Sequence, residues 1–92
     1  MDKLEFCLGE TKKALSKLKL KDKKAEILIK FCKDYYNDAL YYKDKDRETA
    51  LGCAEYAHGF IDAGVLLGFI EIKGYHLSAA RGARRGQGDA IP

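Results

Sequence analysis

The chain has 92 residues, a formal net charge of +3, and a composition that is 47% hydrophobic and 34% charged. That length allows one small domain, and the mixture is typical of soluble globular proteins, which excludes collagen-like, mucin-like and wholly disordered chains. No run of about 20 apolar residues predicts a membrane-spanning helix. The charged first residues lack the apolar stretch of a secretory signal. We therefore expect a cytoplasmic protein that makes no contact with a membrane.

The first predicted helix spans residues 2–18. One side of it carries residues that recur at steps of three and four, the spacing of neighbours on a helix surface. These residues are Leu4, Cys7, Leu8, Thr11, Ala14, Leu15 and Leu18. The helical period is lost over residues 19–21, and Asp22 is expected to cap the second helix.

The second predicted helix spans residues 23–43 and has an apolar side that covers about half of its circumference at ~100° per residue. A side this wide is expected to contact two neighbouring helices. The polar residues 43–46 then form a short turn, in which Asp44 or Asp46 can cap the next helix. So short a connection makes the second and third helices antiparallel.

The third predicted helix spans residues 47–67, and one of its sides is made almost entirely of small residues. This side consists of Ala50, Cys53, Ala54, Ala57, Ile61, Gly64 and Val65. Small side chains allow helix axes to approach closely. A helix that is apolar around most of its surface is expected to be the central helix of the fold or a shared interface.

The last part of the chain changes character after Gly68, which is expected to end the third helix. Alternation over residues 69–74 predicts a short extended segment that lies against the helices. Residues 78–92 are rich in glycine and have no period, which predicts a disordered tail. The predicted fold class is all-α, an antiparallel three-helix bundle in which residues 1–77 form the single domain.

One pattern in the third helix is specific to a family. The pattern is A-x-x-x-x-x-Y-A-x-G-x-x-D-A, formed by Ala50, Tyr56, Ala57, Gly59, Asp62 and Ala63. With the aromatic end of the second helix and the short charged turn, it resembles the archaeal family catalogued as domain of unknown function number 357. The resemblance covers residues 10–72. It implies a small helical bundle of archaeal, cytosolic origin and no established activity.

Three acidic or titratable residues, Glu55, His58 and Asp62, share one flank of the third helix. An imidazole and two carboxylates can bind a metal ion, which makes metal binding an alternative function. The interpretation we favour is structural, with Asp62 orienting His58 four residues earlier and a tyrosine hydroxyl nearby. We therefore assign no metal and no cofactor to this flank.

Six tyrosines and no tryptophan occur in the chain, and most of the tyrosines fall near the end of the second helix. They form either the edge of the core, with rings buried and hydroxyls in water, or a protein interface. The candidate interface residues are Tyr35, Tyr36, Tyr42, Tyr56 and Phe60.

Charge is spread unevenly along the chain. Residues 1–33 hold ten lysines against five acids, residues 34–77 hold four basic residues against eight acids, and residues 78–92 hold three arginines against one acid. Solvated helix faces account for most of this pattern. The alternative is a nucleic-acid-binding accessory. Its candidate contacts are Lys12, Lys13, Lys17, Arg81, Arg84 and Arg85.

The chain lacks the motifs of familiar enzymes. No phosphate-binding glycine loop, zinc-protease helix or nucleophile-elbow pattern occurs. Cys7, Cys32 and Cys53 lack the C-x-x-C spacing of a zinc site and are interpreted as reduced thiols of the core. We assign no catalytic residue, and predict a non-catalytic module that binds a protein partner or self-associates.

Overall fold

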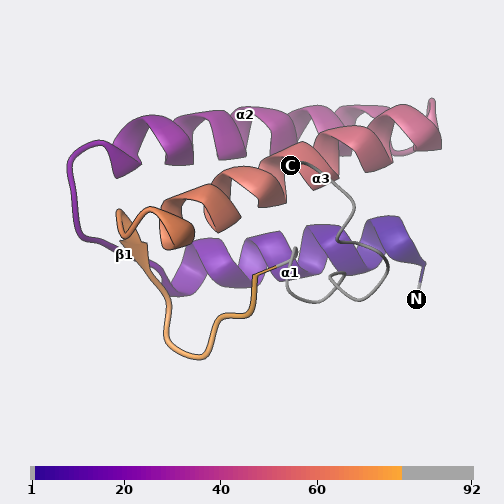
Figure 1. Cartoon of the computed structure of the whole chain (residues 1–92). Helices are drawn as coiled ribbons and strands as arrows, with labels where there is room; N and C mark the ends of the chain where they lie inside the picture. Colours follow the sequence, from indigo (N-terminus) through magenta and orange to yellow (C-terminus); the bar gives the residue numbers. More distant parts are fainter. Residues whose placement is uncertain (1, 78–92) are drawn as a thin grey trace, which may run out of the picture.

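The computed structural model describes residues 2–77. Its elements in chain order are α1 (Lys3–Lys17), β1 (Lys19–Leu20), α2 (Ala25–Tyr42), α3 (Arg47–Leu66) and β2 (Ile70–Glu71). α3 lies between the other two helices and packs against both, and α2 runs opposite to α1 and α3 (Figure 1). The predicted all-α antiparallel three-helix bundle is confirmed. The predicted tail, residues 78–92, lies outside the described residues.

Aspartate side chains start two of the three helices. The carboxylate of Asp2 accepts a hydrogen bond from the Glu5 amide at 2.8 Å, and that of Asp46 accepts one from the Thr49 amide at 3.1 Å. The sequence analysis named Asp44 and Asp46 as possible caps of α3. In the structure, Asp46 is the residue that caps the helix. The hydroxyl and the amide of Thr49 hold the pKa of Asp46 below its ordinary value.

The start of α2 differs from the prediction. Lys24 occupies the cap position, and no side chain caps this helix. Asp22 instead accepts a hydrogen bond from the Lys24 amide at 2.8 Å, in the turn before the helix. The prediction that Asp22 caps α2 was wrong, because an aspartate two residues before the cap position stabilises the turn and not the first amides of the helix.

The end of α3 is fixed by Gly68, which has a φ of +80°. The Phe69 amide donates to the Gly64 carbonyl at 2.9 Å, and the Gly68 amide donates to the Val65 carbonyl at 3.1 Å. This pair of bonds is the Schellman ending, which turns the chain back along the helix. The reversed chain places Ile70 directly on Gly64, where a β-carbon would lie 2.8 Å from Ile70 Cγ1.

The predicted extended segment is β2, and it pairs with β1 in an antiparallel ladder. The Lys21 amide extends the pairing by donating to the Phe69 carbonyl at 2.8 Å. Both strands lie at the end of the bundle opposite the α2–α3 turn, and the chain after β2 folds back beside α1 (Figure 1). The sequence indicated only a break over residues 19–21, so β1 was not predicted.

The core of the described residues is built from unusually small side chains. Six of its eleven buried hydrophobic residues are alanines, and the large ones are Leu4, Leu8, Ile61 and Ile70. Nine large hydrophobic side chains are exposed, namely Phe6, Leu20, Ile27, Phe31, Leu40, Tyr41, Tyr56, Leu66 and Leu67. Among the described residues, more large apolar side chains are exposed than fully buried, and many others are half-buried against the core. No helix within residues 2–77 is both long and apolar enough to cross a membrane.

Candidate functional site

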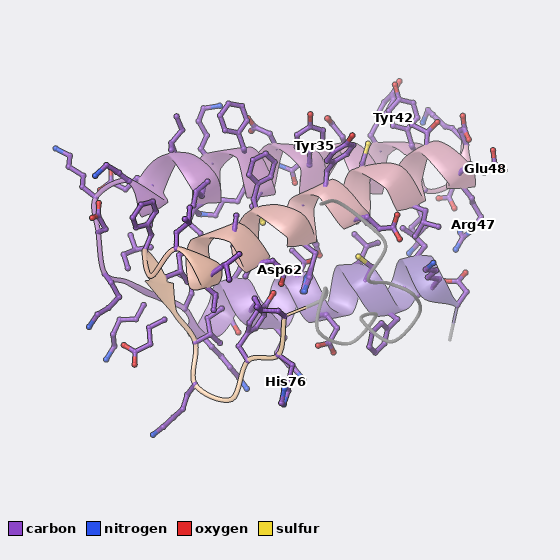
Figure 2. All side chains as sticks on the ribbon, viewed as in Figure 1. Tyr35, Tyr42, Arg47, Glu48, Asp62 and His76 are labelled. Atoms are coloured by element: carbon purple, nitrogen blue, oxygen red, sulfur yellow. The ribbon has the colours of Figure 1, made fainter. Side chains whose placement is uncertain are left out.

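A hydrogen-bond network centred on His58 joins α1, α3 and the segment after β2. His58 is buried, and its Nδ1 lies 2.9 Å from the hydroxyl of Thr11. Its Nε2 lies 2.9 Å from the hydroxyl of Tyr75, which donates to Oδ1 of Asp62 at 2.6 Å. Figure 2 shows Asp62 on the side of α3 that faces α1 and this segment. The network therefore fastens residues 72–77 to the helices.

The donors and acceptors of the network follow from the single hydrogen of a tyrosine hydroxyl. Because Tyr75 donates that hydrogen to Asp62, it accepts one from Nε2 of His58. In the neutral ring Nδ1 then accepts from the Thr11 hydroxyl, whereas in the protonated ring Nδ1 donates to it. Each ring nitrogen of His58 thus has a partner in either charge state. Such an arrangement suits a structural network.

The three flank residues of the sequence prediction all line one recess between α1 and α3, but only His58 and Asp62 belong to the hydrogen-bond network. His58 Nε2 and Asp62 Oδ1 are 4.0 Å apart, with the Tyr75 hydroxyl bonded to both. Glu55 is half-exposed and forms an ion pair with Lys3 at 3.8 Å, outside the network. Across residues 2–77, no group of three or more histidine, cysteine and acidic side chains is arranged to hold a metal ion.

Two recesses lie side by side on the outer surface of α3. Recess one, of about 300 Å³, lies between α1 and α3, and its lining includes Lys3, Phe6, Glu10, Glu55, Gly59 and Asp62. Recess two, of about 540 Å³, is lined by Gly52, Glu55, Tyr56, Gly59, Phe60 and Ala63. The two share Glu55 and Gly59, so they form one continuous surface. We call this surface the open face of α3.

Glycines form much of the floor of recess two. A β-carbon built on Gly52 or Gly59 would meet no atom of the described part of the chain within 4 Å. Glycine inside a helix costs up to ~1 kcal/mol relative to alanine. Close packing among residues 2–77 therefore explains neither glycine.

Tyr56 and Phe60 line recess two, and aromatic rings of α2 pack against them. The ring of Phe60 stacks on those of Phe31 and Tyr35, with centroids 5.6 and 5.9 Å apart, and Tyr35 lies 5.3 Å from Tyr56. Tyr56 is 66% exposed. Phe31 was missed by the sequence analysis, although it stands four residues before Tyr35, where a helix places its neighbour.

The other two aromatic candidates lie elsewhere. Tyr36 and Tyr42 are half-buried and pack against the core cluster that contains Leu4 and Ala39. Tyr42 lies near the turn from α2 into α3, away from Tyr35 (Figure 2). The structure thus places Tyr56 and Phe60 in the lining of recess two and packs the ring of Tyr35 against both.

The candidate nucleic-acid contacts fall into two groups, one in the described residues and one beyond them. Lys12, Lys13 and Lys17 are exposed on α1. Lys13 and Lys17 line a third recess, of about 220 Å³, together with Lys73 from the segment after β2. Lys13 also pairs with Glu10 at 3.8 Å. The remaining candidates, Arg81, Arg84 and Arg85, lie outside the described residues.

Comparison with known proteins identifies the family. A family model described as "Protein of unknown function (DUF357)" matches residues 4–70, a span that includes nearly all of α1, all of α2 and α3, and the start of β2. No curated protein and no solved structure matches the chain. The family match contains His58 and Asp62, the whole lining of recess two, and the lining of recess one except Lys3. The chain belongs to the DUF357 family of proteins of unknown function.

Proposed function

We propose that this protein is a non-catalytic protein-interaction module, and that the open face of α3 binds an apolar helix. The observation that carries the proposal is the space above Gly52 and Gly59, which no atom of residues 2–77 fills. Glycines on a helix surface let another backbone or a large side chain approach closely. A partner helix that packs closely against Gly52 and Gly59 would explain why both positions are glycine.

The residues that line the open face indicate which kind of partner it binds. The stacked rings of Tyr56 and Phe60 border recess two on one side, and Phe6 lies on the far side of recess one. Between them lie Gly52, Gly59 and Ala63, with Glu55 as the charged group that the two recesses share. Recess one adds the charged side chains of Lys3, Glu10 and Asp62. Such a groove suits an amphipathic helix with large aliphatic side chains one or two turns apart.

The composition of the core supports this function. A bundle of this size gains little stability from its own core, and alanines bury less apolar area than larger residues. Covering Tyr56 and Leu66, which are 66% and 71% exposed, would remove two large apolar side chains from water. Binding therefore contributes stability that the isolated bundle lacks.

Site-specific photo-crosslinking in cells tests the proposal. A benzophenone side chain in place of Tyr56 would probe the open face, and one in place of Ile27, which is 57% exposed on α2, would be the control. We expect discrete adducts from position 56 only, joined to helical peptides that mass spectrometry identifies.

Gly59→Lys should abolish these adducts and Gly9→Lys should not, because Gly9 is a helical glycine with equal open space away from the recesses. Equal adduct patterns from positions 56 and 27, or adducts that survive Gly59→Lys, would overturn the proposal.

A second candidate function is nucleic-acid binding, and one observation favours it. Lys73 joins Lys13 and Lys17 around the third recess, so lysines from two segments meet at one surface. Contacts of lysine with phosphates make affinity fall steeply with salt. Replacing these three lysines with glutamine should reduce the slope of log affinity against log salt by about 3. Fluorescence anisotropy with single-stranded RNA measures that slope, and no binding at low salt would dismiss this candidate.

The cytoplasm is the compartment that we propose for this module. Cys7, Cys32 and Cys53 all lie in the described part of the chain, and no disulfide joins them. Burial raises the pKa of the Cys32 thiol to about 11, and burial together with the nearby Asp38 raises that of Cys53. Thiols that stay protonated are poor nucleophiles for disulfide exchange. These features suit a reducing environment.

A further inference from the structure

We infer that the helix bound to the open face is α3 of a second copy of this chain, crossing antiparallel about a two-fold axis at Gly59. This inference rests on the proposed function, because it names the partner of the same surface. Shape, charge and buried area each support this occupant.

The shape argument starts from the positions of Gly52 and Leu66. Each lies seven residues from Gly59, which is about two helical turns. In an antiparallel pair centred on Gly59, residues equally far before and after the centre face each other. Leu66, 71% exposed, then lies over Gly52 of the other copy, where the structure leaves open space. The contact occurs twice because a two-fold interface repeats each of its contacts.

Charge selects the antiparallel orientation over the parallel one. In a parallel pair Glu55 of one copy would face Glu55 of the other. Like charges that face each other destabilise a helix pair. In the antiparallel pair Glu55 faces Ala63, and the two Glu55 residues are separated by eight helical positions, or roughly 12 Å. That separation exceeds the screening length of about 8 Å at physiological salt.

The groove between α1 and α3 adds a second electrostatic match. Recess one is another part of this groove, and its lining carries Glu10, Glu55 and Asp62 against one lysine, Lys3. The segment after β2 covers the adjoining part, beside α1, and carries Lys73 (Figure 1). When a two-fold axis crosses the groove at Gly59, recess one of each copy faces the part of the groove that residues 72–77 cover in the other copy. The basic covering segment of each copy then faces the acidic recess of the other.

The area of this contact sets the expected affinity. Tyr56 and Leu66 each expose on the order of 100 Å², and the flanking residues bring the contact to roughly 500 Å² per copy. A total near 1,000 Å² lies at the lower end of specific interfaces. We therefore expect a reversible dimer with a dissociation constant in the micromolar range, about 1–100 µM.

Disulfide trapping tests the orientation. In a C7S/C53S background that keeps the buried Cys32, a variant with Glu55→Cys is mixed with one carrying Ala63→Cys. The antiparallel pair predicts a disulfide in the mixture and none in either variant alone. A parallel pair predicts the reverse, and that result would overturn the inference.

Sedimentation equilibrium of the unmodified chain tests the dimer itself. We expect Gly52→Leu to raise the dissociation constant roughly tenfold or more by filling the hollow that receives Leu66. Gly9→Leu, at the matched glycine of α1, should leave it unchanged. A wild-type chain that stays monomeric up to about 1 mM overturns the inference. If position 56 still crosslinks a different protein in a Gly59-dependent manner, the proposed function survives without the dimer.

Discussion

The inner and outer sides of α3 are both built from small residues, but only the inner side uses them within the chain. Ala50, Ala54 and Ala57 are fully buried, and Gly64 lies directly under Ile70. Above Gly52 and Gly59 on the outer side, no atom of the described residues comes within 4 Å. A small residue therefore marks a close contact only when the structure shows what approaches it. Where nothing in residues 2–77 approaches, as at Gly52 and Gly59, we propose that a partner makes the contact.

The largest expected effect comes from adding volume to the inner side. Ala57→Leu should destabilise the fold by about 3 kcal/mol, because three extra carbons enter a site with no exposed area. Ala63→Leu, on the outer side, should change stability by about 0.5 kcal/mol or less. Urea denaturation at low protein concentration measures both. Equal losses would show that the two sides are packed alike.

A smaller effect is expected from adding one carbon to each kind of glycine. Gly64→Ala should cost about 2 kcal/mol, because its β-carbon overlaps the buried side chain of Ile70. Gly59→Ala should stabilise the dilute protein by up to about 1 kcal/mol, since alanine favours the helix and nothing obstructs it. Thermal unfolding compares the two. A Gly64→Ala variant as stable as wild type would mean that Ile70 does not pack on α3.

Removing one hydroxyl tests how the segment after β2 is held to the inner side. Tyr75→Phe leaves the Nε2 of His58 and a carboxylate oxygen of Asp62 without their shared partner, so it should cost about 1–2 kcal/mol. Asp62→Ala should cost about as much. In the double variant the losses should not add, because the residues form one network. If the two losses of stability add exactly, Tyr75 and Asp62 contribute independently and do not act as one network.

The smallest effect, at the helix starts, depends on pH. Hydrogen bonds hold the pKa of Asp46 below its ordinary value, so its contribution to stability is complete above about pH 4 and is lost as the pH falls through the lowered pKa. Asp46→Asn keeps an oxygen that caps the helix and removes the titration. Melting temperatures between pH 2 and 7 should therefore fall less steeply for the variant. Parallel curves would exclude Asp46 as a source of acid sensitivity.

The helices could be predicted from the sequence because each carries many residues of one period. β1 could not, because two residues have no period and their pairing partner lies beyond two helices. His58 and Asp62 were predictable as a pair one turn apart on α3. Their link through Tyr75 depends on the chain reversal at Gly68, which brings a distant residue back to the helix. Spacing along one helix could not show that.

Helical spacing also could not show that Glu55 lies outside the hydrogen-bond network of His58 and Asp62. Its spacing from His58 and Asp62 placed all three on one flank, but α1 divides that flank. His58 meets Thr11 on the buried side, and Glu55 meets Lys3 at the edge. Which neighbour covers which part of a helix surface is a tertiary property, and a single helix does not encode it.

The pairing of β1 with β2 has a consequence for the order in which the chain folds. It joins Lys19 to Glu71 and so closes a loop of about fifty residues, at an entropic cost of roughly 3–4 kcal/mol. The α2–α3 hairpin closes through a short turn and forms without that cost. We expect the hairpin to form first and the strand pair to open first. The amide of Lys21, bonded to Phe69, should then exchange its hydrogen through a partial opening that leaves the hairpin intact.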